Sequence, residues 1–250
     1  MVQGADCLSA PGLTRPLSHD ALHWYDESME RIVLHPQQLR LEQDRTLAIP
    51  PERYGLPALF MFRLIDLIYG RARTWQKFKV NEIMARMPYQ AWEHVAYSAI
   101  THTHEQEQYA RRIFERVKES REEQDNEQWH LLIIQEWIKR KGLPESKIKH
   151  RITPRLLAFA FYHLTLILYA IRPGWSYQFN VDLEDHAERE YMTFVLENPE
   201  LEREPFISMF KKDFGSLPTM ADVVRQIAVD ERTHKEESRN KIDMVRLGFA

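Results

Sequence analysis

Two short stretches decide the predicted fold: Glu127-Gln-Trp-His130 and Glu231-Arg-Thr-His234, each a Glu-x-x-His sequence. On a helix, side chains at positions i and i+3 project from one face, so each glutamate and its histidine can bind a common centre. Bundle proteins with dinuclear carboxylate sites take one Glu-x-x-His from each of two helices and one further Glu from each of two others. The two stretches therefore predict a helical bundle around a pair of metal ions.

Each Glu-x-x-His motif is preceded along the chain by a predicted helix that carries further glutamates. The order Glu, Glu-x-x-His, Glu, Glu-x-x-His supplies four carboxylates and two imidazoles. Such ligands suit iron or manganese, and four carboxylates offset the charge of two divalent ions in a buried site. Spacing alone does not select the two additional glutamates, and a bundle with solvated Glu and His faces is the alternative. The candidates are Glu82, Glu93, Glu184, Glu188 and Glu190.

The composition of the 250-residue chain indicates a helical, globular protein. Glycine occurs 8 times, while Leu, Glu, Arg, Gln and Ala are abundant, which favours helices over strands. A formal net charge of −3 provides no basic field for nucleic acid. The single cysteine, Cys7, excludes an intrachain disulfide, a Cys-built zinc site and a cysteine-ligated iron–sulfur cluster. Carboxylate and imidazole are the metal ligands that this composition leaves.

We predict an all-α protein in which four central helices are accompanied by flanking ones, because no alternating strand pattern appears. Pro36 is expected to end a first short helix. The polar stretch 120–126 is expected to separate two central helices, with Asp125 or Asn126 as the cap of the second. The predicted helices span residues 20–35, 57–69, 79–120, 127–141, 154–171, 175–197 and 219–246.

The N-terminal segment bears on the predicted domain boundaries, and two apolar stretches bear on the predicted membrane contact. Residues 1–17 lack a basic start followed by an apolar run, so we expect a flexible arm rather than a signal peptide, and one domain over residues 18–250. The apolar stretches 57–69 and 156–171 are shorter than the roughly 20 residues of a membrane span. Each is either a buried helix or a helix that lies flat in one leaflet.

Four segments, in order along the chain, resemble the alternative oxidase family, and most closely its plastid terminal oxidase branch. The segment Glu82-Ile-Met-Ala-Arg-Met-Pro-Tyr89 is similar to that branch's Glu-Thr-Val-Ala-Arg-Val-Pro-Tyr. The similarity covers roughly residues 57–240. The other three segments are Asn126-Glu-Gln-Trp-His-Leu-Leu132, Leu183-Glu-Asp-His-Ala187 followed by Tyr191, and Asp230-Glu-Arg-Thr-His234.

The resemblance implies a ferritin-like four-helix di-iron bundle, attached to one membrane leaflet, with a specific ligand set. By position it selects Glu82 over Glu93 and Glu184 over Glu188 as the two additional glutamates. The implied iron ligands are Glu82, Glu127, His130, Glu184, Glu231 and His234.

The resemblance also implies roles for residues next to these ligands. Tyr191 aligns with the redox-active tyrosine of the family, which could supply one electron and one proton. Asn126 and Asp230 align with residues that orient the ligands through hydrogen bonds. A buried core tyrosine is the alternative interpretation of Tyr191.

The implied quinol pocket departs from the pattern of the family. Lys77 stands where mitochondrial relatives have an arginine, and Glu190 stands where the family usually has a threonine. The segment 93–107 is unusually polar. Together with Leu183 and Ala187, Lys77 and Glu190 are the implied substrate-binding residues.

The function implied by the resemblance is a cyanide-insensitive quinol oxidase that reduces O2 to water. Its substrates are plastoquinol or ubiquinol and O2, it is a homodimer, and it lies on a bacterial, thylakoid or organelle membrane. A di-iron oxygenase or hydroxylase acting on another small molecule is an alternative, favoured by the polar changes near the pocket. Two further alternatives are a non-catalytic ferritin-like metal-binding protein and a helical scaffold that binds a partner through residues 57–69 and 156–171.

Overall fold

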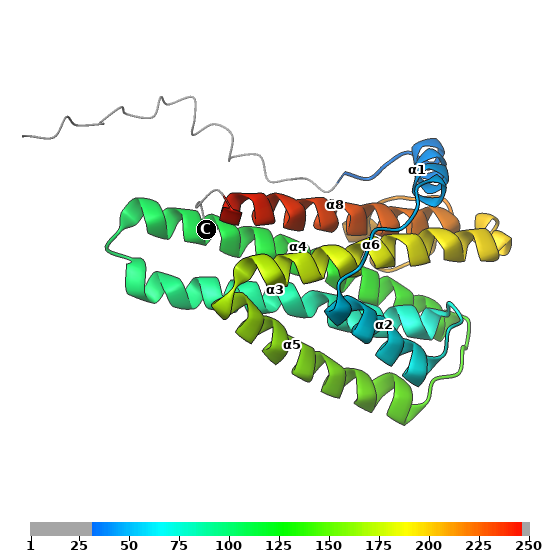
Figure 1. Cartoon of the computed structure of the whole chain (residues 1–250). Coiled ribbons are helices and arrows are strands. Elements are labelled where there is room, and N and C mark those ends of the chain that lie inside the picture. The colour runs from blue at the N-terminus through cyan, green and yellow to red at the C-terminus, as the bar shows by residue number, and fades with distance from the viewer. Residues whose placement is uncertain (1–31, 247–250) are drawn as a thin grey trace, which may run out of the picture. The chain divides into compact units, whose positions relative to one another are not determined.

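The computed structural model describes residues 32–246, and its helices belong to the compact unit that begins at Leu34. Every regular element in this part of the chain is helical, so the predicted all-α class is confirmed. Short elements connect the long helices: a π-helical turn η2 (Ile148–Ile152), a 3₁₀ turn η3 (Pro199–Glu202) and α7 (Lys211–Phe214). The long helices are α1 (Pro36–Ala48), α2 (Leu56–Tyr69), α3 (Trp75–Thr103), α4 (Glu107–Arg140), α5 (Thr153–Ile171), α6 (Pro173–Glu197) and α8 (Met220–Arg246) (Figure 1).

Four of the long helices form the central bundle. α3 packs along α4, and α6 packs along α8 (Figure 1). The flanking helices pack on the outside: α5 against α3 and α6, α2 against α6, and α1 against α8 and α6. The two helices with Glu-x-x-His motifs are α4 and α8, and α3 and α6 complete the bundle.

Among the apolar clusters of the described residues, two join most of these helices. The larger one joins α4, α6 and α8 through fully buried side chains such as Ile134, Met192 and Ile227. Removing one such side chain from water contributes roughly 1.5–3 kcal/mol to folding. A second cluster, which includes Val80 and Phe161, packs α2 and α5 against α3 and α6.

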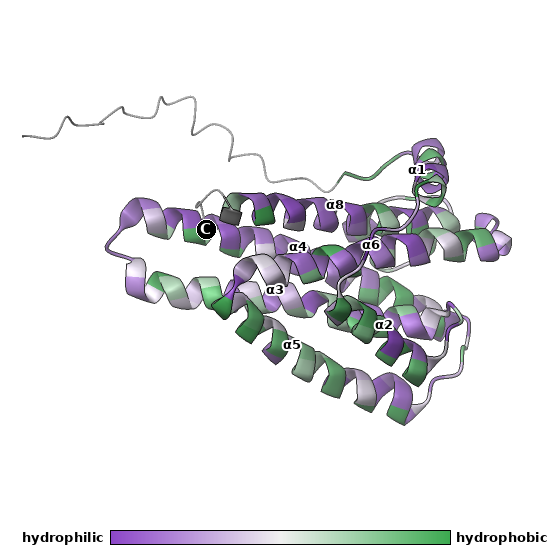
Figure 2. Ribbon diagram, in the orientation of Figure 1, coloured by the Kyte–Doolittle hydropathy of each residue, from purple (hydrophilic) through white to green (hydrophobic). Residues whose placement is uncertain are grey.

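The outer faces of α2 and α5 are also apolar. Figure 2 shows both helices as hydrophobic along most of their length, whereas α4 and α8 are largely hydrophilic outside the core. Leu56, Phe60 and Leu67 on α2 are 68–83% exposed. On α5, Leu156 and Phe159 are exposed by about two thirds.

The break between the first two bundle helices was predicted in the wrong place. α4 runs without interruption through the polar stretch 120–126, and the chain turns instead at residues 104–106. The stretch 120–126 contains no glycine or proline, and its Glu, Arg and Gln residues are good helix formers. Ser120 and Glu123 are buried, so packing also favours the helix there.

Pro36 begins a helix, whereas we predicted that it ends one. Proline suits the first position of a helix, because its fixed φ is helical and the N–H that it lacks would have no partner there. His35 caps α1: its side chain accepts from Gln37 N–H, and its own N–H donates to the Gln38 side chain. The predicted arm at residues 1–17, with Cys7, and most of the predicted helix 20–35 lie outside the described residues.

Candidate metal centre

The structure brings six side chains from the four bundle helices into one cluster. α3 supplies Glu82, and α6 supplies Glu184. The remaining four are the motif residues of α4 and α8: Glu127, His130, Glu231 and His234.

The cluster divides into two adjacent groups of possible metal ligands. One contains Glu82 and His130, and the other contains Glu184 and His234. Glu127 and Glu231 belong to both groups, and the ligand atoms in each group lie within 4.8 Å of one another. Two sites that share two carboxylates are the arrangement expected for a dinuclear centre.

All six side chains are buried. Glu127 and His130 are 0% exposed, and the most exposed member, His234, reaches 4%. An ionised carboxylate without compensating charge is costly at this depth. The bundle therefore needs positive charge at this position.

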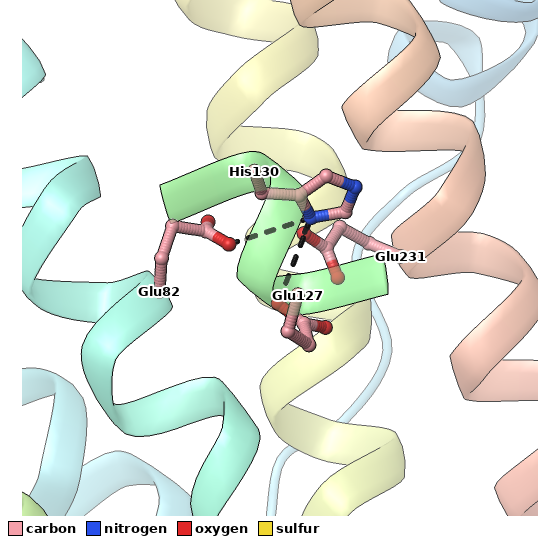
Figure 3. Close-up of side chains that lie close together, drawn as sticks. All are labelled: Glu82, Glu127, His130 and Glu231. Atoms are coloured by element: carbon pink, nitrogen blue, oxygen red, sulfur yellow. Dashed lines mark ion pairs between the residues drawn. The ribbon is translucent and has the colours of Figure 1, made fainter. Parts of the chain in front are cut away.

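The two histidines direct Nδ1 toward the carboxylates. Figure 3 shows His130 between Glu82, Glu127 and Glu231, with its Nδ1 3.4 Å from Glu82 Oε2 and 3.3 Å from Glu231 Oε1. In the other group, His234 Nδ1 lies 2.9 Å from Glu127 Oε1 and 3.5 Å from Glu231 Oε2. His130 thus presents Nδ1 to carboxylates of two other helices, and His234 presents Nδ1 to Glu127 of α4 and to Glu231 of its own helix.

Most of the atoms that face the cluster have no hydrogen-bond partner among the described residues. They lie near one another, but their geometry does not form hydrogen bonds, and buried polar atoms of this kind are rare. Carboxylate oxygens and imidazole nitrogens in this arrangement fit the ligand preference of iron or manganese. The atoms are Glu82 Oε2, Glu127 Oε1 and Oε2, Glu231 Oε2, His130 Nδ1 and His234 Nδ1.

The electrostatics of the cluster also indicate a shortage of positive charge. Burial, reinforced by the negative charge of neighbouring glutamates, raises the pKa of Glu82 and of Glu184 well above the ordinary value. Burial would also raise the pKa of Glu127, but His130 and His234 outweigh it and lower that pKa. Burial alone would lower the pKa of both histidines, yet the surrounding carboxylates raise it. Divalent cations at this position would supply the positive charge that the buried carboxylates need.

The residues predicted to support the ligands differ in what they contact. Asp230 accepts a hydrogen bond at 3.0 Å from Nε2 of His130, which fixes the ring so that Nδ1 faces the cluster. Tyr191 is 1% exposed and donates a hydrogen bond to Glu82 Oε1, while its ring stacks on Phe78 at 4.3 Å. Asn126 has its Oδ1 buried without a hydrogen-bond partner among the described residues, so its role stays a prediction.

The other candidate glutamates make ion pairs outside the cluster. Glu93 accepts from Arg121 at 2.7 Å. Glu188 accepts from Lys235 at 2.7 Å in a separate network between α6 and α8. Glu190 pairs with Arg73.

Two contacts to the cluster were missed by sequence reasoning. Tyr89 donates to Glu184 Oε1 at 2.7 Å, and Asn180 donates to the same oxygen at 3.1 Å. Spacing gave a signal for both, because Tyr89 follows Glu82 by two turns and Asn180 precedes Glu184 by one.

The four predicted substrate-binding residues lie on two bundle helices: Lys77 on α3, and Leu183, Ala187 and Glu190 on α6. Lys77 is buried and donates to Asp66 at 2.6 Å and to the carbonyl of Gly70. Glu190 pairs with Arg73 at 2.7 Å. Leu183 packs against the α2–α5 core cluster, and Ala187 is half-buried.

The fold and the cluster define a helical-bundle protein with a buried di-metal carboxylate site. The sequence matches the alternative oxidase family over residues 72–242, and the chain belongs to that family. The family has a di-iron site in such a bundle, with which the buried glutamates and histidines agree.

The chain is also similar to a curated plant protein, ubiquinol oxidase 4, chloroplastic/chromoplastic, of Arabidopsis thaliana. The two are 29% identical over 141 residues, which is 54% of this chain. The matched region spans about a third, 35%, of the length of that relative.

Proposed function

We propose that the chain is a di-iron quinol oxidase that couples quinol oxidation to the reduction of O2 to water. The single observation that carries this proposal is the pair of buried ligand groups sharing Glu127 and Glu231, in a chain that belongs to the alternative oxidase family. The name of the plant relative, a ubiquinol oxidase, supports a quinol as the reductant.

In this proposal one iron is held by Glu82 and His130, the other by Glu184 and His234, and Glu127 and Glu231 serve both. When bound, the two ions supply the redox chemistry that transfers electrons from quinol to O2. The protein excludes bulk water, since every ligand is buried.

Two residues that form hydrogen bonds with the ligands orient one of them and hold a proton beside another. Asp230 holds the His130 ring so that Nδ1 faces the metal. Tyr191 donates its phenolic proton to a hydrogen bond with Glu82 Oε1, so this proton can move to that carboxylate when the phenol is oxidised. This contact supports the redox role for Tyr191.

We further propose that the chain attaches to one leaflet of a membrane through α2 and α5. The helix that runs from Ile148 through Ile171 is 24 residues, longer than the apolar stretch suggested, and is long and apolar enough to cross a membrane by length and composition. Its buried residues, which include Ala158, Phe161 and Thr165, form one stripe that packs along the bundle. A helix held lengthwise in this way fits a position in the plane of one leaflet.

The surface around these helices suits contact with lipid headgroups and entry of a quinol. Exposed cationic residues border the apolar face, among them Arg63, Arg71 and Arg155. A groove of about 590 Å³ is lined by Arg63, Asp66, Leu67 and Arg71. Asp66 also binds Lys77, so this groove adjoins one of the residues expected at the quinol pocket.

The test is oxygen uptake by iron-loaded protein in lipid vesicles, with plastoquinol or ubiquinol and with cyanide present. Glu127→Ala should abolish uptake, whereas Glu93→Ala, which changes a glutamate outside the cluster, should not. No quinol turnover by loaded wild-type protein would overturn the proposal. If isotope-labelled O2 leaves its label in an organic product, the chain is an oxygenase. If the chain takes up far more than two iron ions, it is a ferritin-like protein. The proposal includes a homodimer, which light scattering tests.

A further inference from the structure

The two glutamates outside the Glu-x-x-His motifs are each bonded by a tyrosine of the other's helix. Tyr191 of α6 donates to Glu82 Oε1 on α3, and Tyr89 of α3 donates to Glu184 Oε1 on α6 at 2.7 Å. Each tyrosine follows the glutamate of its own helix by seven residues, about two turns. Both tyrosines are buried, at 1% and 0% exposed. The two halves of the bundle therefore repeat one pattern of contacts.

Asn180 fixes the direction of the Tyr89 hydrogen bond. Its Nδ2 donates to the Tyr89 hydroxyl at 2.9 Å and to Glu184 Oε1 at 3.1 Å, and it lies 3.2 Å from Ser238 Oγ. A carboxylate that binds a metal ion is ionised and only accepts, so the amide nitrogen of Asn180 must face Glu184. Because the Tyr89 oxygen accepts from Asn180, its own proton points to Glu184.

Both donors occupy the same oxygen of Glu184, Oε1, which leaves Oε2 for another ligand. The arrangement at Glu82 is the same: Oε1 accepts from Tyr191, and Oε2 is buried without a hydrogen-bond partner in the described part of the chain. Glu82 Oε2 lies 3.4 Å from His130 Nδ1, on the side of the cluster.

We propose that Tyr89, supported by Asn180, is a positioning residue that holds Glu184 by one oxygen so that the other binds the metal ion. The inference rests on the proposed di-iron function. Hydrogen-bond partners of metal ligands usually contribute about 10–100-fold to metal affinity, because they restrict the ligand to its binding orientation. Tyr89 therefore acts on metal binding, through Glu184, and not on the quinol.

The test compares Tyr89→Phe with Tyr177→Phe. The first variant keeps the ring, which packs against Trp92 at 5.1 Å, and removes only the hydroxyl. Tyr177 is a matched control: it is 2% exposed, packs against Trp92 at 4.7 Å, and its hydroxyl bonds to Tyr169 at 3.0 Å rather than to the cluster. The melting temperatures of the two metal-free variants show whether loss of the Tyr89 hydroxyl and loss of the Tyr177 hydroxyl destabilise the fold equally.

The measurement is anaerobic calorimetric titration of each protein with Fe²⁺, with iron per chain checked by metal analysis. Tyr89→Phe should bind iron about 10–100-fold more weakly than wild type, and Tyr177→Phe should bind like wild type. Unchanged affinity in Tyr89→Phe, or an equal loss in both variants, would overturn the inference, since the second result means general loosening of the bundle. A wild-type chain that binds no iron would instead overturn the proposed function, so the two failures are distinguishable.

Discussion

Lys235 joins α6 and α8 through a buried ion network, and we expect its loss to destabilise the chain strongly. Its Nζ donates to Asp185 at 3.0 Å and to Glu188 at 2.7 Å, with the Lys235 side chain 10% exposed. Lys235→Met keeps the aliphatic stem but leaves two carboxylates, 2% and 4% exposed, without this cation. Removing one partner of a buried ion pair costs about 3–5 kcal/mol, because the remaining charge stays buried.

The expected cost lies at the low end of this range. Glu188 keeps its contact with Arg232 at 2.9 Å, and Asp185 keeps Tyr54 at 2.8 Å. We therefore expect a loss of about 3 kcal/mol, which lowers the melting temperature by roughly 6–12 °C for a chain of this length.

The assay is urea and thermal unfolding of metal-free protein at pH 7, followed by circular dichroism. The matched control is Arg111→Met, which also removes one cation from an ion pair. The Arg111 side chain is 70% exposed, so its pair with Glu115 should contribute at most about 1 kcal/mol. If the two variants lose the same stability, the reasoning from burial is refuted.

Three further outcomes test the site and the surface. Fe²⁺ at about 100 times its Kd should stabilise the wild type by about 2.7 kcal/mol for each ion bound, because the ligands meet only in the folded chain. A persisting iron-induced shift of the melting temperature in Glu127→Ala would contradict the site. Phe60→Ser with Leu67→Ser should weaken co-sedimentation with anionic vesicles at least about tenfold, since each side chain contributes roughly 1.5–3 kcal/mol on leaving water. The control is Leu41→Ser on α1, where the leucine side chain is 58% exposed, and it should leave vesicle binding unchanged. An equal loss of vesicle binding in the control and in the α2 variant would argue against the α2–α5 surface. Burial would raise the pKa of Asp185, but its hydrogen bonds and cationic neighbours lower it below 3.8. The ionised Asp185 therefore stabilises the fold at pH values above its pKa in the unfolded chain, and this stabilisation is lost as the pH falls through its lowered pKa in the folded chain. Acid unfolding of Asp185→Asn should accordingly depend less on pH below about 4.

The parts of the site that depend on local periodicity could be predicted from the sequence. The i, i+3 spacing of the two motifs places Glu127 with His130 and Glu231 with His234 on any helix, whatever surrounds it. The third and fourth carboxylates could not be chosen in this way, because several glutamates share a helical face. In the structure, Glu93 lies three turns beyond Glu82 on α3 and pairs with Arg121, so the choice depends on packing of α3 against α4.

The helix boundaries also could not be predicted from local sequence alone. The turn at residues 104–106 has no proline or glycine, so the sequence carries no strong signal for it. The stretch 120–126 is polar enough to suggest a loop, yet its Glu, Arg and Gln residues are good helix formers, and burial of Ser120 and Glu123 also favours a helix there. Solvent exposure and helix breaking are different properties, and polarity reports only the first.

The distribution of unsatisfied atoms argues that the cluster is built for cations and is not an accident of packing. Ten buried side-chain polar atoms in the described chain lack a hydrogen-bond partner, and six of them belong to the cluster. The outward atoms of the same ligands are bonded: Glu82 Oε1 to Tyr191, Glu184 Oε1 to Tyr89, and His130 Nε2 to Asp230. Poor packing would leave inward and outward atoms unsatisfied alike. A shell that satisfies only the outward atoms holds the inward ones in place for ligands of opposite charge.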